Sequence, residues 1–211
     1  MKSQNPVQPP RTAVWLITAF SPGEEGETIL GDLLEEFSPF ALKAGMAAAR
    51  LWYWRQTLKT IPHLIAAGFG TAPWSTTAAV TGGFLLHRFV HGLPDKLLRV
   101  VTDRHLAYWS THFEIYMFWA TSGMLIAHLI ASVFTGCLVA SAAKRREMVA
   151  TVTLAFVLGA LGITASLLWV VRTGDMWMLA LQSGDALAVA MGGVIVRLHR
   201  TAATTSLPSR T

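Results

Sequence analysis

The sequence predicts an all-α integral membrane protein, in which short cytoplasmic amphipathic helices at the N-terminus precede a four-helix transmembrane bundle. Hydrophobic residues make up 53% of the 211 residues and charged residues only 14%, whereas ordinary soluble domains carry about 25% charged residues. The apolar residues are concentrated after residue 60 in long charge-poor runs. Each run approaches the roughly 20 residues that a helix needs to cross a bilayer core.

Composition also excludes several classes of protein and of site. A soluble monomer is excluded by the low charge, and a collagen-like chain by the scattered Gly and Pro. The net charge of +5 does not indicate a nucleic-acid partner, because the basic residues lie at the ends of the apolar runs. The single Cys137 allows no internal disulfide and no cysteine metal cluster.

Residues 1–62 are expected to form a cytoplasmic, interfacial helical domain of three short helices. Pro9 and Pro10 are suited to opening the first helix. The run Ser21-Pro22-Gly23-Glu24 has the residues of a capping box and predicts the start of the second. Ser38-Pro39 repeats this signal and predicts that the third helix begins there and runs to about Thr60.

The second and third of these helices carry a candidate protein-contact surface. On the second helix, apolar residues occupy one face and carboxylates the other, the spacing of an amphipathic helix. We expect Asp32, Glu35 and Glu36 to face Arg50, Arg55 and Lys59 of the third helix. Interleaved aromatic and basic residues are typical of a membrane interface. The candidate surface comprises Asp32, Glu35, Glu36, Trp52, Tyr53, Trp54 and Arg55.

About residues 9–62 resemble the permease prefix domain of macrolide-exporter-like, duplicated-permease-type bacterial ABC transporter permeases. The resemblance rests on Pro9-Pro10-Arg11, on Gly31-Asp32-Leu33-Leu34-Glu35-Glu36-Phe37, on Gly45, and on Trp52-Tyr53-Trp54-Arg55-Gln56-Thr57-Leu58. It implies a prefix role beside an exporter. Such permeases continue for hundreds of residues, with a large extracytoplasmic domain, whereas this chain continues with four short-looped spans. The resemblance therefore implies the prefix role and not the transport activity.

The transmembrane domain is expected over residues 63–200, followed by a disordered cytoplasmic tail at 201–211. Its four spans are expected at about 64–86, 115–143, 148–171 and 176–196, with a short helix near 95–101 after the first. Pro73 either kinks the first span or marks its true start. Small residues four apart predict close helix packing; the pairs are Ala127/Ala131, Ser132/Gly136, Ala155/Gly159 and Ala188/Gly192.

The basic residues predict the orientation of these spans. With four crossings, one side of the membrane holds 12 of the 17 Lys and Arg residues. The positive-inside rule then places both termini in the cytoplasm, and the expected location is the bacterial inner membrane.

Two ionisable residues, His128 and Asp185, fall near the middle of the predicted spans. Such groups are costly in a bilayer and are functional candidates by default. A His–Asp pair could relay protons or hold a cation. The structural alternative is a hydrogen bond between spans, with Gln182, Ser183 or a backbone carbonyl as the partner of Asp185.

Metal and cofactor chemistry has weaker support. His87 and His128 are the only histidines that could ligate a b-type haem together, and His87 with His91 lacks a third zinc ligand. No Gly-x-Ser-x-Gly, Walker A or His-Glu-x-x-His sequence occurs, and Asp185 is a single intramembrane aspartate. We therefore expect no cofactor and no enzymatic activity.

The sequence thus leaves three functions open. The first is an accessory or regulatory membrane component, whose partners would be lipid, an ABC exporter permease or a second copy of the chain. The second is a small proton- or ion-coupled transporter that uses His128 and Asp185. The third is a haem-binding membrane redox protein.

Overall fold

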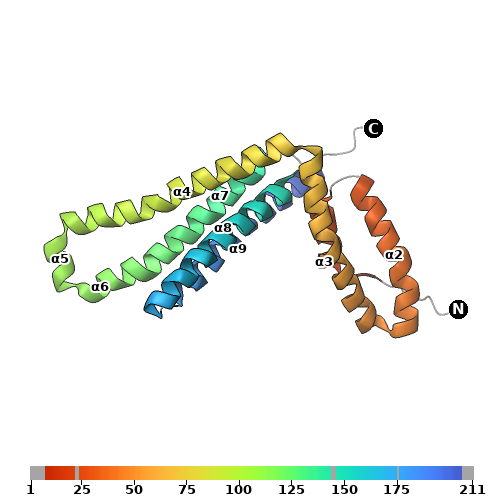
Figure 1. Cartoon of the computed structure of the whole chain (residues 1–211), viewed down its shortest axis with the longest axis horizontal. Coiled ribbons are helices and arrows are strands. Elements are labelled where there is room, and N and C mark those ends of the chain that lie inside the picture. The colour runs from red at the N-terminus through yellow and green to blue at the C-terminus, as the bar shows by residue number, and fades with distance from the viewer. Residues whose placement is uncertain (1–7, 22–23, 144–145, 175, 206–211) are drawn as a thin grey trace. The chain divides into compact units, whose positions relative to one another are not determined.

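The computed structural model describes residues 8–21, 24–143, 146–174 and 176–205, and all regular structure in these ranges is helical. The chain divides into two compact units, residues 1–73 and 74–211. Figure 1 shows the helices of each unit.

The first unit contains α1 (Arg11–Phe20), α2 (Glu24–Ala44) and α3 (Met46–Thr71). Its core is an aromatic pair between α2 and α3. Phe37 and Tyr53 are both fully buried, and their rings meet edge to face with centroids 5.6 Å apart. Ala13 of α1 packs into the same cluster, so one apolar seam joins all three helices.

The boundary between α2 and α3 differs from the sequence prediction. The Ser38-Pro39 signal does not begin a helix, because α2 continues through Pro39 to Ala44. Pro39 lacks the N–H that a helix interior normally donates, and the preceding Ser38 hydroxyl donates to the Leu34 carbonyl at 3.3 Å. The chain turns at Gly45, whose φ of 87° lies in the left-handed region that favours glycine.

The predicted start of α2 can be compared with the structure only from Glu24 onward. The predicted capping box includes Pro22 and Gly23, which lie outside the described residues. The first described helical residue is Glu24, and the acidic residues Glu24, Glu25 and Glu27 occupy the first turn. Carboxylates at this end are favourable because they face the positive end of the helix dipole.

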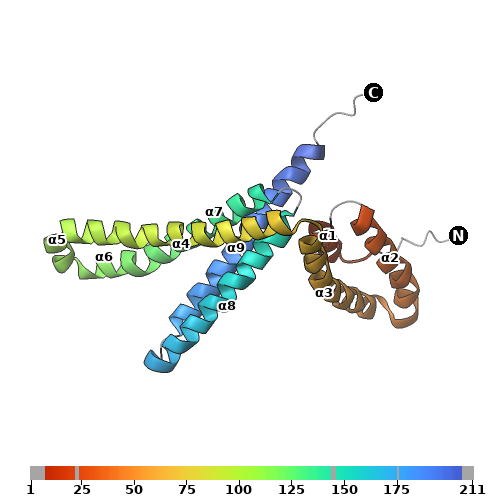
Figure 2. The same cartoon turned by 45° about the horizontal axis from the view of Figure 1, so that its top comes forward.

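The second unit begins with a long helical hairpin, whose two arms lie side by side in both Figure 1 and Figure 2. One arm is α4 (Pro73–Arg104), and α5 (Leu106–Thr111) closes the hairpin. The other arm is a continuous helix made of α6 (Phe113–Phe118), a π turn η1 (Trp119–Gly123) and α7 (Met124–Ala142). Then follow α8 (Glu147–Thr173) and α9 (Trp177–Thr205), which pack against each other and against α7.

Three helices in the described part of the chain are long and apolar enough to cross a membrane: Phe113–Ala142, Glu147–Thr173 and Leu179–Ala202. They correspond to the second, third and fourth expected spans. The expected tail at 201–211 begins as helix, since α9 runs to Thr205, and residues 206–211 lie outside the described residues.

The first expected span, 64–86, is not one helix. The break lies at Ala72, where α3 has ended at Thr71 and α4 has not begun, because Pro73 disfavours a helical conformation in the residue before it. Pro73 therefore marks a helix start. The short helix expected near 95–101 is part of the same α4, which continues to Arg104.

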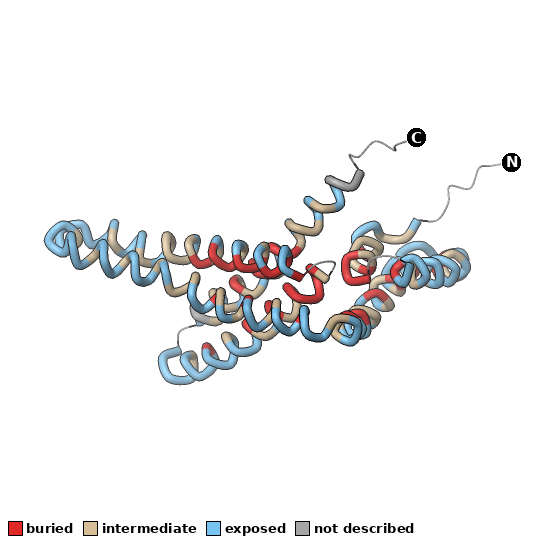
Figure 3. Tube along the Cα trace, turned by 90° about the horizontal axis from the view of Figure 1, so that it is seen from above, coloured by how far each residue is buried: buried red, intermediate tan, exposed pale blue. Residues whose placement is uncertain are grey.

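The core of the second unit lies around the junction of α7 and α8, where buried residues gather, whereas the far end of the α4–α6 hairpin is exposed (Figure 3). Leu154 of α8 and Val189 of α9 are fully buried there. Glycines let α7 and α9 approach to backbone contact. A Cβ at Gly136 would overlap the Val189 carbonyl, and one at Gly192 would lie 2.6 Å from the Cys137 backbone nitrogen. The small-residue pattern thus serves helix packing at these two positions.

We predict that Gly192→Ala weakens this packing by about 1–3 kcal/mol, because the added methyl overpacks the α7–α9 contact. Thermal unfolding of the purified chain in detergent measures the effect. Gly184→Ala is the matched control on the same helix, since its Cβ would lie 3.4 Å from the flexible end of Leu129. Equal unfolding temperatures for both variants would contradict the backbone contact.

Candidate functional site

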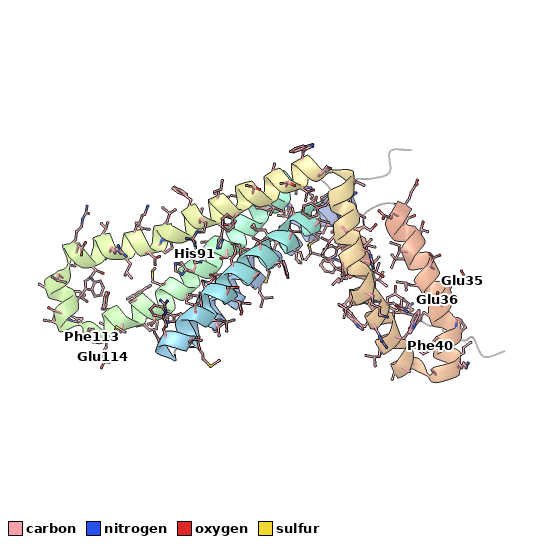
Figure 4. The ribbon with its side chains drawn as sticks, viewed as in Figure 1. Glu35, Glu36, Phe40, His91, Phe113 and Glu114 are labelled. Carbon is pink, nitrogen blue, oxygen red and sulfur yellow. The ribbon has the colours of Figure 1, made fainter. Side chains whose placement is uncertain are left out.

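A cluster of ionisable groups, several of them buried, lies where α4, α7 and α9 meet. Helix α4 contributes His87, His91 and Asp95, which are four residues apart and therefore follow one another along a single face. Helix α7 contributes His128 and Ser132 at the same spacing, and α9 contributes Asp185. Figure 4 labels His91 on the ribbon of α4, where that helix passes the others.

Asp185 is the anchor of this cluster. It is 2% exposed, and each of its carboxylate oxygens has a partner from a different helix. The Ser132 hydroxyl donates to Oδ1 at 3.0 Å. Nε2 of His91 lies 2.9 Å from Oδ2, a distance at which the ring N–H donates to the carboxylate. A buried carboxylate without such partners would be strongly destabilising.

The three imidazoles of the cluster form a contiguous series. The His91 ring stacks on that of His128 with centroids 4.0 Å apart and an interplanar angle of 19°. The His91 ring also lies next to the His87 ring, with centroids 4.8 Å apart. Nε2 of His128 is 3.7 Å from Oδ1 of Asp95, whose side chain is 58% exposed. The series therefore leads from the buried carboxylate of Asp185 to the exposed carboxylate of Asp95.

The sequence prediction of a His128–Asp185 pair needs correction. Both residues belong to the cluster, but His91 of α4 is the histidine that bonds Asp185. Neither of the two side chains named as alternative partners bonds Asp185 in the described structure: the Ser183 hydroxyl donates to the Leu179 carbonyl, and Gln182 lines a separate pocket. Sequence reasoning missed Ser132 and Asp95, although the spacing of His87, His91 and Asp95 was a signal that one face of α4 is polar.

The geometry bears on the haem and zinc alternatives. Because the His91 ring contacts both of the other imidazoles, a porphyrin would reach His87 and His128 together only if His91 moved away. Within the described ranges, no group of three or more His, Cys, Asp or Glu side chains is arranged to hold a metal ion. The zinc alternative with His87 and His91 therefore gains no third ligand from the fold.

A second buried charge lies at the N-terminus of α8. Glu147 begins this helix and is 2% exposed. Its carboxylate accepts from the guanidinium of Arg200 and lies 3.6 Å from that of Arg197, both on α9. These contacts fasten the N-terminus of α8 to the C-terminal part of α9. Both contacts join α8 to α9 and indicate a helix clamp, which the sequence analysis did not identify.

The candidate contact surface in the first unit is smaller than predicted. Tyr53 is fully buried and belongs to the core, and burial raises the pKa of its hydroxyl. Trp52 and Trp54 are half-buried against this core, and Trp52 stacks on Phe40 with centroids 5.7 Å apart. Figure 4 shows Phe40 between α2 and α3.

The charged members of that surface remain exposed; they are Asp32, Glu35, Glu36 and Arg55. The predicted pairing of the three carboxylates with Arg50, Arg55 and Lys59 is wrong. No ion pair joins these six described side chains, because the helices meet through Phe37 and Tyr53 and the carboxylates lie off that seam.

Comparison with family models, with curated proteins and with solved structures gave no match to this chain.

We predict that Asp185→Leu destabilises the second unit by about 1–3 kcal/mol, because it leaves the Ser132 hydroxyl and the His91 ring buried without their acceptor. Asp185→Asn is the matched control, since its amide oxygen still accepts one hydrogen bond at nearly the same size. Chemical unfolding in mixed micelles compares the two. A leucine variant as stable as the asparagine variant would show that the two donors do not depend on the carboxylate.

Proposed function

We propose that the chain is a multi-pass protein of the bacterial inner membrane with four crossings, in which α4 crosses beside the three apolar helices. Large apolar side chains are exposed on α8 and α9, among them Phe156, Val171 and Leu187, and such surfaces favour a lipid environment. At 32 residues, α4 is about 48 Å long, more than a bilayer core requires. Its close contact with Val139 and Leu154 at Gly83 supports a place in the same bundle.

The topology has a direct test. Single cysteines at positions 5 and 205, introduced into a Cys137→Ser background, should both be protected from a membrane-impermeant thiol reagent in intact cells. Both should react after the membrane is permeabilised. This outcome follows from four crossings and from the 12 of 17 basic residues on one side. Labelling of one terminus alone in intact cells would indicate an odd number of crossings and leave α4 outside the membrane.

Within this membrane protein, we infer that the histidine–aspartate cluster exchanges protons in a small proton-coupled transporter. One observation carries the inference: Asp185, His91, His128 and Asp95 lie one after another through a hydrogen bond, a ring stack and a 3.7 Å approach, from a side chain 3% exposed to one 58% exposed. Buried chains of Asp and His mark proton relays in membrane proteins.

A purely structural role explains this arrangement less well. A carboxylate that only joins helices needs a donor for each oxygen, and Ser132 and His91 already supply these. His87 and His128 extend the series without bonding Asp185, and a buried nitrogen on each, Nδ1 of His87 and Nε2 of His128, has no hydrogen-bond partner. Imidazole gains and loses a proton near neutral pH more readily than other side chains. The extra rings are thus suited to pass protons to and from the carboxylate.

We predict that His91→Gln and Asp185→Asn abolish proton movement while the protein still folds. Purified chain is reconstituted into liposomes enclosing a pH-sensitive dye, and inward gradients of organic acids, amino acids, amines and sugars are applied one class at a time. The unmodified chain should move protons with one class at least tenfold faster than either variant.

His105→Gln serves as the control for this assay, because His105 is exposed and lies outside the cluster. It should behave as the unmodified chain does. Proton movement that survives Asp185→Asn, or the absence of protein-dependent movement with every class, would contradict the proposal.

An accessory role beside an exporter is the second candidate, and the exposed carboxylates of α2 favour it. Asp32, Glu35 and Glu36 make no ion pair with described residues, so they are available to a basic partner. The resemblance of residues 9–62 to a permease prefix proposes an ABC exporter permease, or a second copy of the chain, as that partner.

We predict that changing Asp32, Glu35 and Glu36 to lysine removes such a partner without unfolding the first unit, because all three side chains are exposed. Affinity purification from mild detergent, followed by mass spectrometry, compares the triple variant with the unmodified chain. The control changes Glu24, Glu25 and Glu27, the acidic residues of the first turn. Co-purification of the same membrane protein with the triple variant would argue against this surface.

A further inference from the structure

A polar pocket separate from the Asp185 carboxylate lies between α4, α8 and α9. It has a volume of about 320 Å³. One wall carries His87, Arg88 and His91 of α4, and Gln182 of α9 lies beside them. The opposite wall is apolar and includes Leu158, Leu161 and Ala165 of α8.

Three of the polar groups in this pocket have no partner in the described part of the chain. Arg88, an exposed residue, makes no ion pair. His87 is only 7% exposed, and its Nδ1 is buried without a hydrogen-bond partner. Gln182 extends over Gly162, where an added Cβ would overlap its amide oxygen. An unpaired cation, a buried nitrogen and an amide thus share one pocket.

The charge of the pocket favours a negatively charged ligand. None of its described lining residues is a carboxylate, and the buried Asp185 beside His91 is occupied by His91 and Ser132. A guanidinium presents two parallel N–H donors, which match the two oxygens of a carboxylate. The apolar wall on α8 suits a hydrocarbon body attached to that group, as in most small-molecule sites, where a few polar groups fix the orientation.

We propose that this pocket binds a small organic acid, with the carboxylate on Arg88 and Gln182 and the apolar body against α8. The inference rests on the proposed function, for which it supplies the class of the transported solute. His91 borders both the pocket and Asp185, so a bound carboxylate would lie next to the residue that exchanges the proton.

Titration calorimetry of the full-length chain in detergent tests the proposal, with benzoate as the probe. Benzoate should bind saturably, and Arg88→Gln should weaken binding at least tenfold. Gln182→Leu should weaken it by a smaller factor. Arg99→Gln, which removes a positive charge from an exposed position about three turns further along α4, should leave binding unchanged. Benzamide, of the same shape but uncharged, should not bind measurably.

Three results would overturn the proposal: no saturable benzoate binding, equal affinities for Arg88→Gln and the unmodified chain, or tighter binding of inorganic phosphate than of benzoate. The last would indicate a phosphate site, such as one for a lipid headgroup. The assay needs no membrane and no proton gradient. Proton movement with another solute class, without benzoate binding, would overturn this inference alone, and benzoate binding without proton movement would overturn only the proposed function.

Discussion

A carboxylate buried among apolar helices is tolerable only if its oxygens accept hydrogen bonds, and this requirement organises the second unit. Asp185 meets it with donors from two other helices, Ser132 of α7 and His91 of α4. The bond to His91 gives α4 a polar attachment to a core that is otherwise apolar. It also explains how a helix that carries His87, His91 and Asp95 on one face lies against three helices that are apolar enough to cross a membrane. The same contact places the imidazole series beside a pocket that has no carboxylate among its described lining residues.

Two further constraints hold the core to which α4 attaches. Gly136 and Gly192 bring the backbones of α7 and α9 together, which leaves no space for a side chain at either position. The clamp of Glu147 on Arg197 and Arg200 fastens α8 to α9 at one end. Close packing and a paired charge therefore fix α7, α8 and α9, whereas the hydrogen bond and ring contacts of the cluster are the main polar links of α4.

Sequence reasoning succeeded where the signal is local. The three long apolar helices were each located, the first two within two residues at both ends, because hydropathy over about 20 positions reports on each helix separately. The last was predicted to end at residue 196, whereas the apolar helix continues to Ala202. Sequence reasoning failed where the outcome depends on distant contacts. His91 and Asp185 are 94 residues apart, and no local pattern pairs them. Tyr53 was assigned to a surface because aromatic and basic residues surround it, but its position opposite Phe37 puts it in the core. Ser38-Pro39 resembles a helix start, yet α2 continues through Pro39 and the turn falls at Gly45 instead.

The His91–Asp185 bond fixes the middle of α4 against the core, which α4 also contacts through apolar side chains near Gly83. Spin labels on Leu85 of α4 and Leu187 of α9, both exposed, would report the distance between these helices in a Cys137→Ser background. We expect a single narrow distance distribution for the labelled chain that keeps His91, and a longer, broader one when His91→Leu removes the bond. Distributions that are the same with and without the His91→Leu substitution would contradict this role of the bond.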